Sequence, residues 1–78
     1  MPRPLKYRDV IQRLRAHDKA FAVFVNRGKG SERIIFHPNI NGRSESFPIK
    51  CHGEGTEIRV GMLSALIRRF QLPRGFFD

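Results

Sequence analysis

The sequence predicts an α+β fold in which a helix is followed by three antiparallel strands and a second helix. One apolar face with helical spacing lies early in the chain, and a second lies late in it. Three short segments between these faces are separated by turns that contain glycine. Because antiparallel neighbours need only short connections, both helices can cover one face of a three-stranded sheet, which gives a two-layer sandwich.

The first helix is predicted from about residue 7 to about residue 16. Its apolar residues follow the i, i+3, i+4, i+7 spacing of one helical face: Tyr7, Val10, Ile11 and Leu14. Residues 1–6 contain two prolines and are predicted to form a loose N-terminal arm.

The first strand is predicted at residues 20–25, a continuous apolar run that is typical of a strand buried on both faces. The second strand is predicted at residues 32–37, with Ile34 and Phe36 on one face and His37 on the other. A turn is expected at residues 38–42, where Asn41-Gly42 is a favoured hairpin dipeptide.

The third strand is predicted at residues 43–50, and Pro48 places it at a sheet edge because proline has no amide to donate. Residues 51–57 form a loop in which Thr56 is a candidate helix cap. The second helix is expected at residues 58–71, and its apolar face consists of Met62, Leu63, Leu66, Ile67 and Phe70.

The chain is expected to form one domain over residues 1–78, because 78 residues allow one small core. Pro73 ends the second helix, and residues 73–78 are expected to be a short C-terminal tail. Its Phe76 and Phe77 are either a lid on the core or an exposed apolar end. No internal repeat or second domain is indicated.

The charge of the chain indicates a polyanionic partner. Fifteen Lys and Arg residues face seven Asp and Glu residues, which gives a net charge of +8. Nucleic acid is the first candidate, an acidic protein the second and a membrane surface the third, while the alternative is a basic protein without such a partner. The single Cys51 and the lack of a long apolar run predict a cytoplasmic protein.

A basic glycine-rich turn precedes the second strand, and it is a candidate phosphate-binding site. Its cations, glycine and hydroxyl are Arg27, Lys29, Gly30, Ser31 and Arg33. The alternative is an ordinary hairpin loop whose charges are solvated. Arg59 and Arg68, near the second helix, are further candidates for phosphate contact, or else part of a solvated face.

Several segments resemble HicA-type toxins, the YcfA-like family of prokaryotic toxin–antitoxin pairs. The similar residues, in chain order, are Tyr7–Ile11 with Leu14, Lys29-Gly30-Ser31, Arg33-Ile34, His37-Pro38, Phe47-Pro48-Ile49, His52-Gly53, and Gly61-Met62-Leu63 with Leu66-Ile67-Arg68. The resemblance implies a fold like that of double-stranded-RNA-binding domains and cleavage of messenger RNA without a metal. It also implies neutralisation by a HicB-type antitoxin.

One position departs from the family pattern, because Glu32 stands where the family has its catalytic histidine after Gly-Ser. A carboxylate can accept the proton of a ribose 2′-hydroxyl, but cleavage also needs an acid for the leaving oxygen. His37 is the candidate acid, although five residues of regular strand send Glu32 and His37 to opposite faces unless a bulge intervenes. His52 is a second, looser candidate.

Three functions therefore remain open. The chain is an endoribonuclease with Glu32 as an altered base, a non-catalytic RNA-binding module, or a domain whose basic face binds an acidic antitoxin-like protein. No metal or other cofactor is predicted, because Cys51 and His52 are adjacent and lack the paired spacing of a zinc site.

Overall fold

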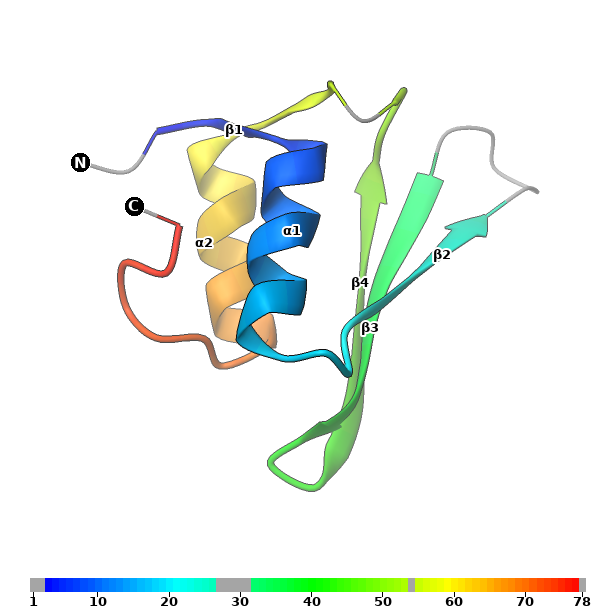
Figure 1. Cartoon of the computed structure of the whole chain (residues 1–78), viewed down its shortest axis with the longest axis vertical. Coiled ribbons are helices and arrows are strands. Elements are labelled where there is room, and N and C mark those ends of the chain that lie inside the picture. Colours follow the sequence, from blue (N-terminus) through cyan, green and yellow to red (C-terminus); the bar gives the residue numbers. More distant parts are fainter. Residues whose placement is uncertain (1–2, 27–31, 54, 78) are drawn as a thin grey trace.

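The computed structural model describes residues 3–26, 32–53 and 55–77. Two helices, α1 (Tyr7–His17) and α2 (Val60–Arg69), lie side by side against one face of a three-stranded sheet (Figure 1). The sheet is antiparallel, with strand order β2-β3-β4. This architecture confirms the predicted α+β class, with two helices covering one face of three antiparallel strands.

Helix α1 forms where the apolar spacing predicts it and continues one residue further, to His17. Tyr7, Val10 and Leu14 are buried on the side of the helix that faces the sheet. They share this side because residues three or four apart lie on one face of a helix. The chain leaves the helix at Asp18, whose Oδ1 accepts a hydrogen bond of 2.9 Å from the amide of Ala20. This side-chain bond closes the turn into the first strand of the sheet.

Strand β2 (Ala22–Asn26) is an edge strand that pairs only with β3 in the part of the chain that the structure describes. The prediction that this segment is buried on both faces is wrong, because Phe24 is 55% exposed and Val25 is 59% exposed. Both helices lie on the same side of the sheet, so among the described residues no element covers the other face of β2 (Figure 1). An apolar run alone cannot distinguish these two situations.

Strands β3 (Glu32–Ile40) and β4 (Arg43–Lys50) form a hairpin around the predicted turn at Asn41 and Gly42. Both turn residues have positive φ, 53° and 85°, as a two-residue hairpin turn requires. The predicted turn at residues 38–42 is too long, because β3 continues through Pro38 with a register shift between His37 and Ile40. A bulge accommodates proline there without breaking the strand.

A second, small sheet pairs β1 (Leu5–Lys6) with β5 (Glu57–Ile58). The amide of Tyr7 extends this pairing by donating a 2.8 Å hydrogen bond to the carbonyl of Thr56. Residues 5 and 6 are therefore not a loose arm, because Leu5 packs against the core and its backbone is paired. A two-residue strand has too little pattern to be found from sequence alone.

Helix α2 is shorter than the predicted 58–71, because Glu57 and Ile58 are extended in β5. Thr56 does not cap it. The Thr56 hydroxyl instead accepts a 3.0 Å hydrogen bond from the amide of His52, and the residue at the N-cap is Arg59, without a side-chain cap.

The core lies between the two helices and the inner face of the sheet. Its fully buried side chains include Val10, Leu14, Ile35, Ile49, Leu66 and Phe77. Burial of Phe77 shows that the C-terminal tail covers the core rather than forming an exposed apolar end, and the half-buried Phe76 packs its ring edge against His17. Within the described residues, neither helix is long and apolar enough to cross a membrane.

Candidate functional site

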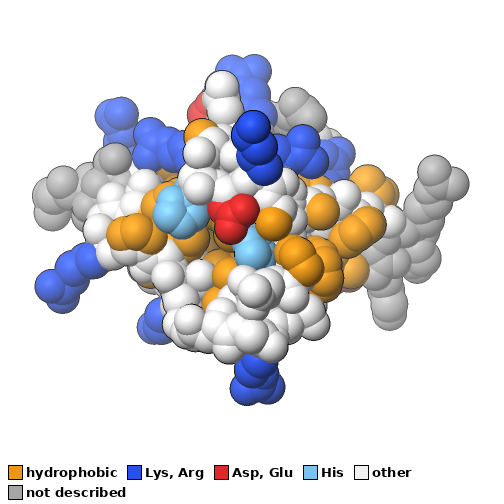
Figure 2. Space-filling view, turned by 60° about the horizontal axis from the view of Figure 1, so that its bottom comes forward, with side chains coloured by type: hydrophobic (Ala, Val, Ile, Leu, Met, Phe, Trp, Pro, Cys, Tyr) orange, Lys and Arg blue, Asp and Glu red, His pale blue; other side chains and the backbone are white. Residues whose placement is uncertain are grey.

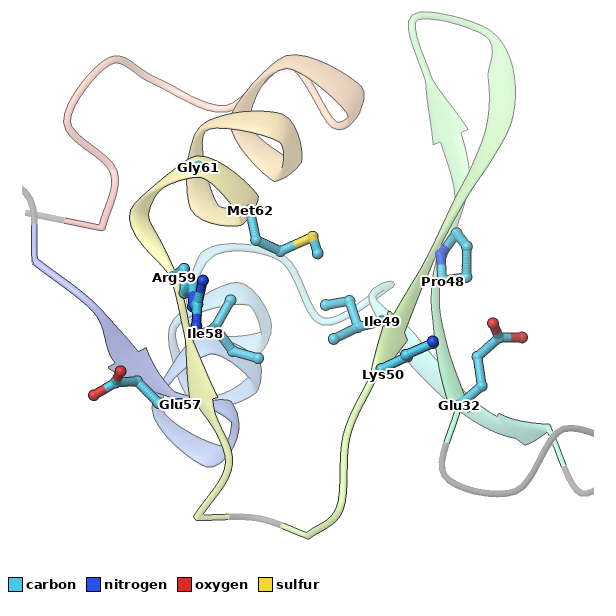
Figure 3. Close-up of a pocket in the computed structure, with 9 residues that line it drawn as sticks. All are labelled: Glu32, Pro48, Ile49, Lys50, Glu57, Ile58, Arg59, Gly61 and Met62. Carbon is cyan, nitrogen blue, oxygen red and sulfur yellow. The ribbon is translucent and has the colours of Figure 1, made fainter.

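An open groove of about 680 Å³ runs along the free edge of β4, between that strand and the start of α2. Figure 3 shows the residues that line it, which belong to β3, β4, β5 and α2, with Arg59 between β5 and α2. They are Glu32, Pro48, Ile49, Lys50, Glu57, Ile58, Arg59, Gly61 and Met62. The groove therefore brings together the beginning of β3, the end of β4 and the beginning of α2.

Glu32 and Lys50 form one wall of the groove as direct cross-strand partners. Directly opposed residues of an antiparallel pair have their side chains on the same face, about 5 Å apart at Cβ. Both belong to the face of the sheet that the helices leave open, together with Ile34 and Pro48 two residues further along. A carboxylate and an ammonium group thus lie beside each other at the mouth of the groove.

The opposite wall is the first turn of α2, with Arg59 at its N-cap and Met62 extending toward β4 (Figure 3). The first hydrogen bond of the helix is donated by the Leu63 amide to the Arg59 carbonyl, at 3.0 Å. Amides of the first helical turn have no acceptor within their own helix, and the helix dipole is positive at this end. Lys50, Arg59 and the helix start make this region suited to an anion, beside the carboxylates of Glu32 and Glu57.

His37 lies on the inner face of the sheet, away from Glu32, because the register shift comes after His37 rather than before it. The side chain is buried at 4% exposure. Its Nδ1 accepts a 3.0 Å hydrogen bond from the amide of Asn39, so its Nε2 carries the proton and donates to Asp18 Oδ2 at 2.8 Å. The structure does not bring the two candidate catalytic residues together, and both ring nitrogens of His37 have protein partners.

The carboxylate of Asp18, at the end of α1, is the partner of the buried His37 and is itself 44% exposed. Its pKa is lowered from the ordinary value, first by the hydrogen bond from the Ala20 amide and second by the hydrogen bond from His37. The ring of His37 also packs edge-on against Phe21, with centroids 4.7 Å apart. These contacts give His37 a structural role in joining α1 to β3.

The predicted phosphate-binding residues divide among different parts of the molecule. Arg27, Lys29, Gly30 and Ser31 lie outside the described residues. Arg33 follows Glu32 but belongs to the inner face, where its guanidinium lies 5.0 Å from the centre of the Tyr7 ring. There it lines a separate hollow of about 380 Å³ with Arg8 and Arg15.

Arg59 and Arg68 lie at opposite ends of α2 and line different hollows. Arg59 lies at the N-terminal end of the helix and lines the groove. Arg68 lies in the last turn and lines another hollow, beside Glu45 and Arg69. Nine residues of helix separate them by about 13 Å along the axis.

Lys50 is a site residue that residue type and spacing alone do not indicate. The Asn41-Gly42 turn was a signal that could have found it, since a two-residue turn fixes which residues face each other. An unbroken ladder from that turn, however, would set Glu32 opposite Cys51. The shift between His37 and Ile40 moves the pairing by one residue and sets Glu32 opposite Lys50.

His52 and Cys51 follow the end of β4, close in sequence to the groove. His52 is exposed, whereas Cys51 is buried and its thiol donates a 2.9 Å hydrogen bond to the carbonyl of Gly53. Among the residues that the structure describes, no three His, Cys, Asp or Glu side chains gather as a metal site would require.

Comparisons of the chain with protein-family models, with curated proteins and with solved structures found no match in any of the three.

Proposed function

We propose that this chain is an RNA-binding protein of the HicA type, with a fold like that of double-stranded-RNA-binding domains. The groove beside β4 holds a phosphate of the RNA. The observation that carries the proposal is the cross-strand placement of Lys50 beside Glu32, with Arg59 on the facing wall of the same groove. Proteins commonly contact phosphate through cationic side chains and through the N-terminus of a helix, and this groove has both.

Two further features support this proposal. The order of helix, three antiparallel strands and helix is the one that the family resemblance implies. The net charge of +8 favours a polyanion as the partner.

A second function, metal-independent cleavage of messenger RNA, is favoured by the Glu32–Lys50 pair itself. Glu32 would accept the proton of a 2′-hydroxyl as that oxygen attacks the phosphorus. The 5′-oxygen leaves and takes a proton, which the ammonium group of Lys50 can supply, whereas an arginine cannot. The products would be a 2′,3′-cyclic phosphate and a free 5′-hydroxyl.

A HicB-type antitoxin is the protein partner that this proposal implies. An acidic segment of such a partner would neutralise Lys50 and Arg59 and cover the groove, so inhibition and RNA binding would compete for one surface. The proposed place of action is the cytoplasm, where messenger RNA is present.

The test is incubation of the purified protein with a labelled messenger RNA in EDTA. We expect the wild type to bind the RNA, and we expect Lys50→Gln combined with Arg59→Gln to weaken binding about 10-fold or more, since two phosphate contacts are lost.

Cleavage, where it occurs, should be lost in Glu32→Gln without loss of binding. The variant Lys50→Arg should retain binding and lose cleavage, because it keeps the charge and removes the proton donor.

His37→Gln is the control for a catalytic role of His37: because His37 lies on the other face of the sheet, this variant should cleave RNA like the wild type once circular dichroism has shown that it is folded. Equal RNA binding by the wild type and the double variant Lys50→Gln, Arg59→Gln would contradict the proposal. Cleavage by Glu32→Gln at the rate of the wild type would show that Glu32 is not the base.

A further inference from the structure

The open face of the sheet carries an apolar patch that neither helix covers. Its members alternate along the three strands and share one face by the pairing register: Ala22, Phe24, Ile34, Phe36 and Pro48. In Figure 2, a group of hydrophobic side chains lies on the right of the view, which is the side on which Figure 1 draws the sheet. Within the described residues this patch contributes nothing to the core, so burial in the core does not explain its two aromatic rings.

The rings of Phe24 and Phe36 lie side by side on neighbouring strands. Their centroids are 5.9 Å apart and their planes are inclined by 63°. Phe24 is 55% exposed, which is high for a phenylalanine on a strand. Two adjacent rings on an open sheet face provide apolar surface on which planar groups can stack, one group on each ring, because the two rings are not coplanar.

Charge on the same face indicates what the planar partner is. The row of residues next to Ile34 and Pro48 on the open face consists of Glu32 and Lys50, which belong to the groove. A chain that stacks its rings on Phe24 and Phe36 can therefore place its backbone at Lys50. Among polyanions with planar apolar groups, a single-stranded nucleic acid meets both requirements, because duplex bases are already stacked on each other.

We propose that the open face of the sheet binds single-stranded RNA by stacking unpaired bases on Phe24 and Phe36. The inference rests on the proposed function, which supplies the phosphate contact at Lys50. It adds the substrate class, namely unpaired rather than duplex RNA. Stacking is tolerant of base identity, so this face distinguishes single-stranded from duplex RNA rather than one base sequence from another.

The experiment measures the affinity of three fluorescein-labelled oligonucleotides of equal length by fluorescence anisotropy. They are a single-stranded RNA, its duplex and a strand of abasic phosphodiesters. Each is titrated with the wild type and with Phe24→Leu, which keeps an apolar side chain and removes the ring. We expect the wild type to prefer the single strand, and Phe24→Leu to lose about 5- to 100-fold of that affinity, as for one lost stacking contact.

Val25→Ala is the matched control, because Val25 is as exposed as Phe24 and alternates to the opposite face of the same strand. It should leave all three affinities unchanged. The affinity for the abasic strand should be the same for the wild type and Phe24→Leu. Both substitutions lie on exposed positions, and circular dichroism checks that the variants are folded.

The possible failures can be told apart. Salt-sensitive binding of all three strands that Phe24→Leu does not change would overturn the stacking inference and leave the phosphate site intact. Absence of salt-sensitive binding to any strand would overturn the proposed function and the inference with it. A dimer of the wild type in sedimentation that Phe24→Ser converts to a monomer would also overturn the inference, because the patch would then bind a second copy of the chain.

Discussion

His37 joins α1 to the sheet through Asp18 and through the ring of Phe21. A histidine before a proline in a basic chain is open to a catalytic or a structural interpretation, and the sequence left both open. Burial and the accepted bond at Nδ1 explain its position without any ligand. Side-chain partners nineteen residues apart, as here, have no signal in local sequence.

Asp18 makes the stability of the protein depend on pH in the acid range. Its pKa is lower in the folded chain than the ordinary value of 3.8, because of the Ala20 amide first and His37 second. A lowered folded pKa means that the carboxylate stabilises the folded state above the ordinary value, and that this contribution is lost as the pH falls through the folded pKa. Asp18→Asn should therefore be less stable than the wild type at neutral pH, and the difference should shrink below about pH 4.

Urea unfolding of Asp18→Asn and the wild type, followed by circular dichroism from neutral to acid pH, measures this difference. A gap between the two unfolding midpoints that stays constant into strong acid would show that the Asp18 carboxylate has no lowered pKa in the folded state.

Lys50 illustrates the limit of residue-level prediction in the site. Glu32 and Arg59 could be nominated from residue type and position alone. The pairing of Glu32 with Lys50 instead depends on a one-residue shift near Pro38, which changes every partner between that point and the groove. Pro38 can be read from the sequence, but the sequence alone does not determine which of the two strands contains the extra residue of the bulge.

At the scale of elements, both helices and all three strands of the main sheet were predictable, because each has several residues of clear period. The pair β1–β5 was not, since its pairing is non-local and each strand has two residues. The exposure of β2 was mispredicted for a different reason. Whether an apolar strand has one covering layer or two depends on where the helices pack.

Alanine substitutions at two glycines test whether the hairpin turn requires a positive φ, because only one of these glycines has it. Gly42 has φ of +85°, and a Cβ there would meet nothing within 4 Å, so Gly42→Ala adds only backbone strain. We expect it to destabilise the protein by about 1 kcal/mol. Gly61 also has open space around it but lies in the first turn of α2, so Gly61→Ala should stabilise by up to about 1 kcal/mol.

Chemical denaturation of the two alanine variants supplies the comparison. Equal stability of Gly42→Ala and the wild type would mean that the turn does not require a positive φ at position 42.

At the scale of the whole molecule, the charge predicts how RNA binding depends on salt. If the chain contacts about four to six phosphates, the logarithm of the association constant should fall with the logarithm of salt concentration at a slope of roughly −3 to −5. Lys50→Gln combined with Arg59→Gln should reduce that slope by about two. Anisotropy titrations at several salt concentrations measure it, and a flat response would exclude a polyanion as the partner.

The pair β1–β5 determines where the chain can change in length. Helix α1 begins directly after β1, and α2 begins two residues after β5, so one short ladder fixes the starting point of both helices. An inserted residue between Lys6 and Tyr7 would turn α1 by about 100° relative to that ladder and carry Tyr7 and Val10 away from the core. Homologues of this protein should therefore keep a constant spacing at the β1–α1 junction.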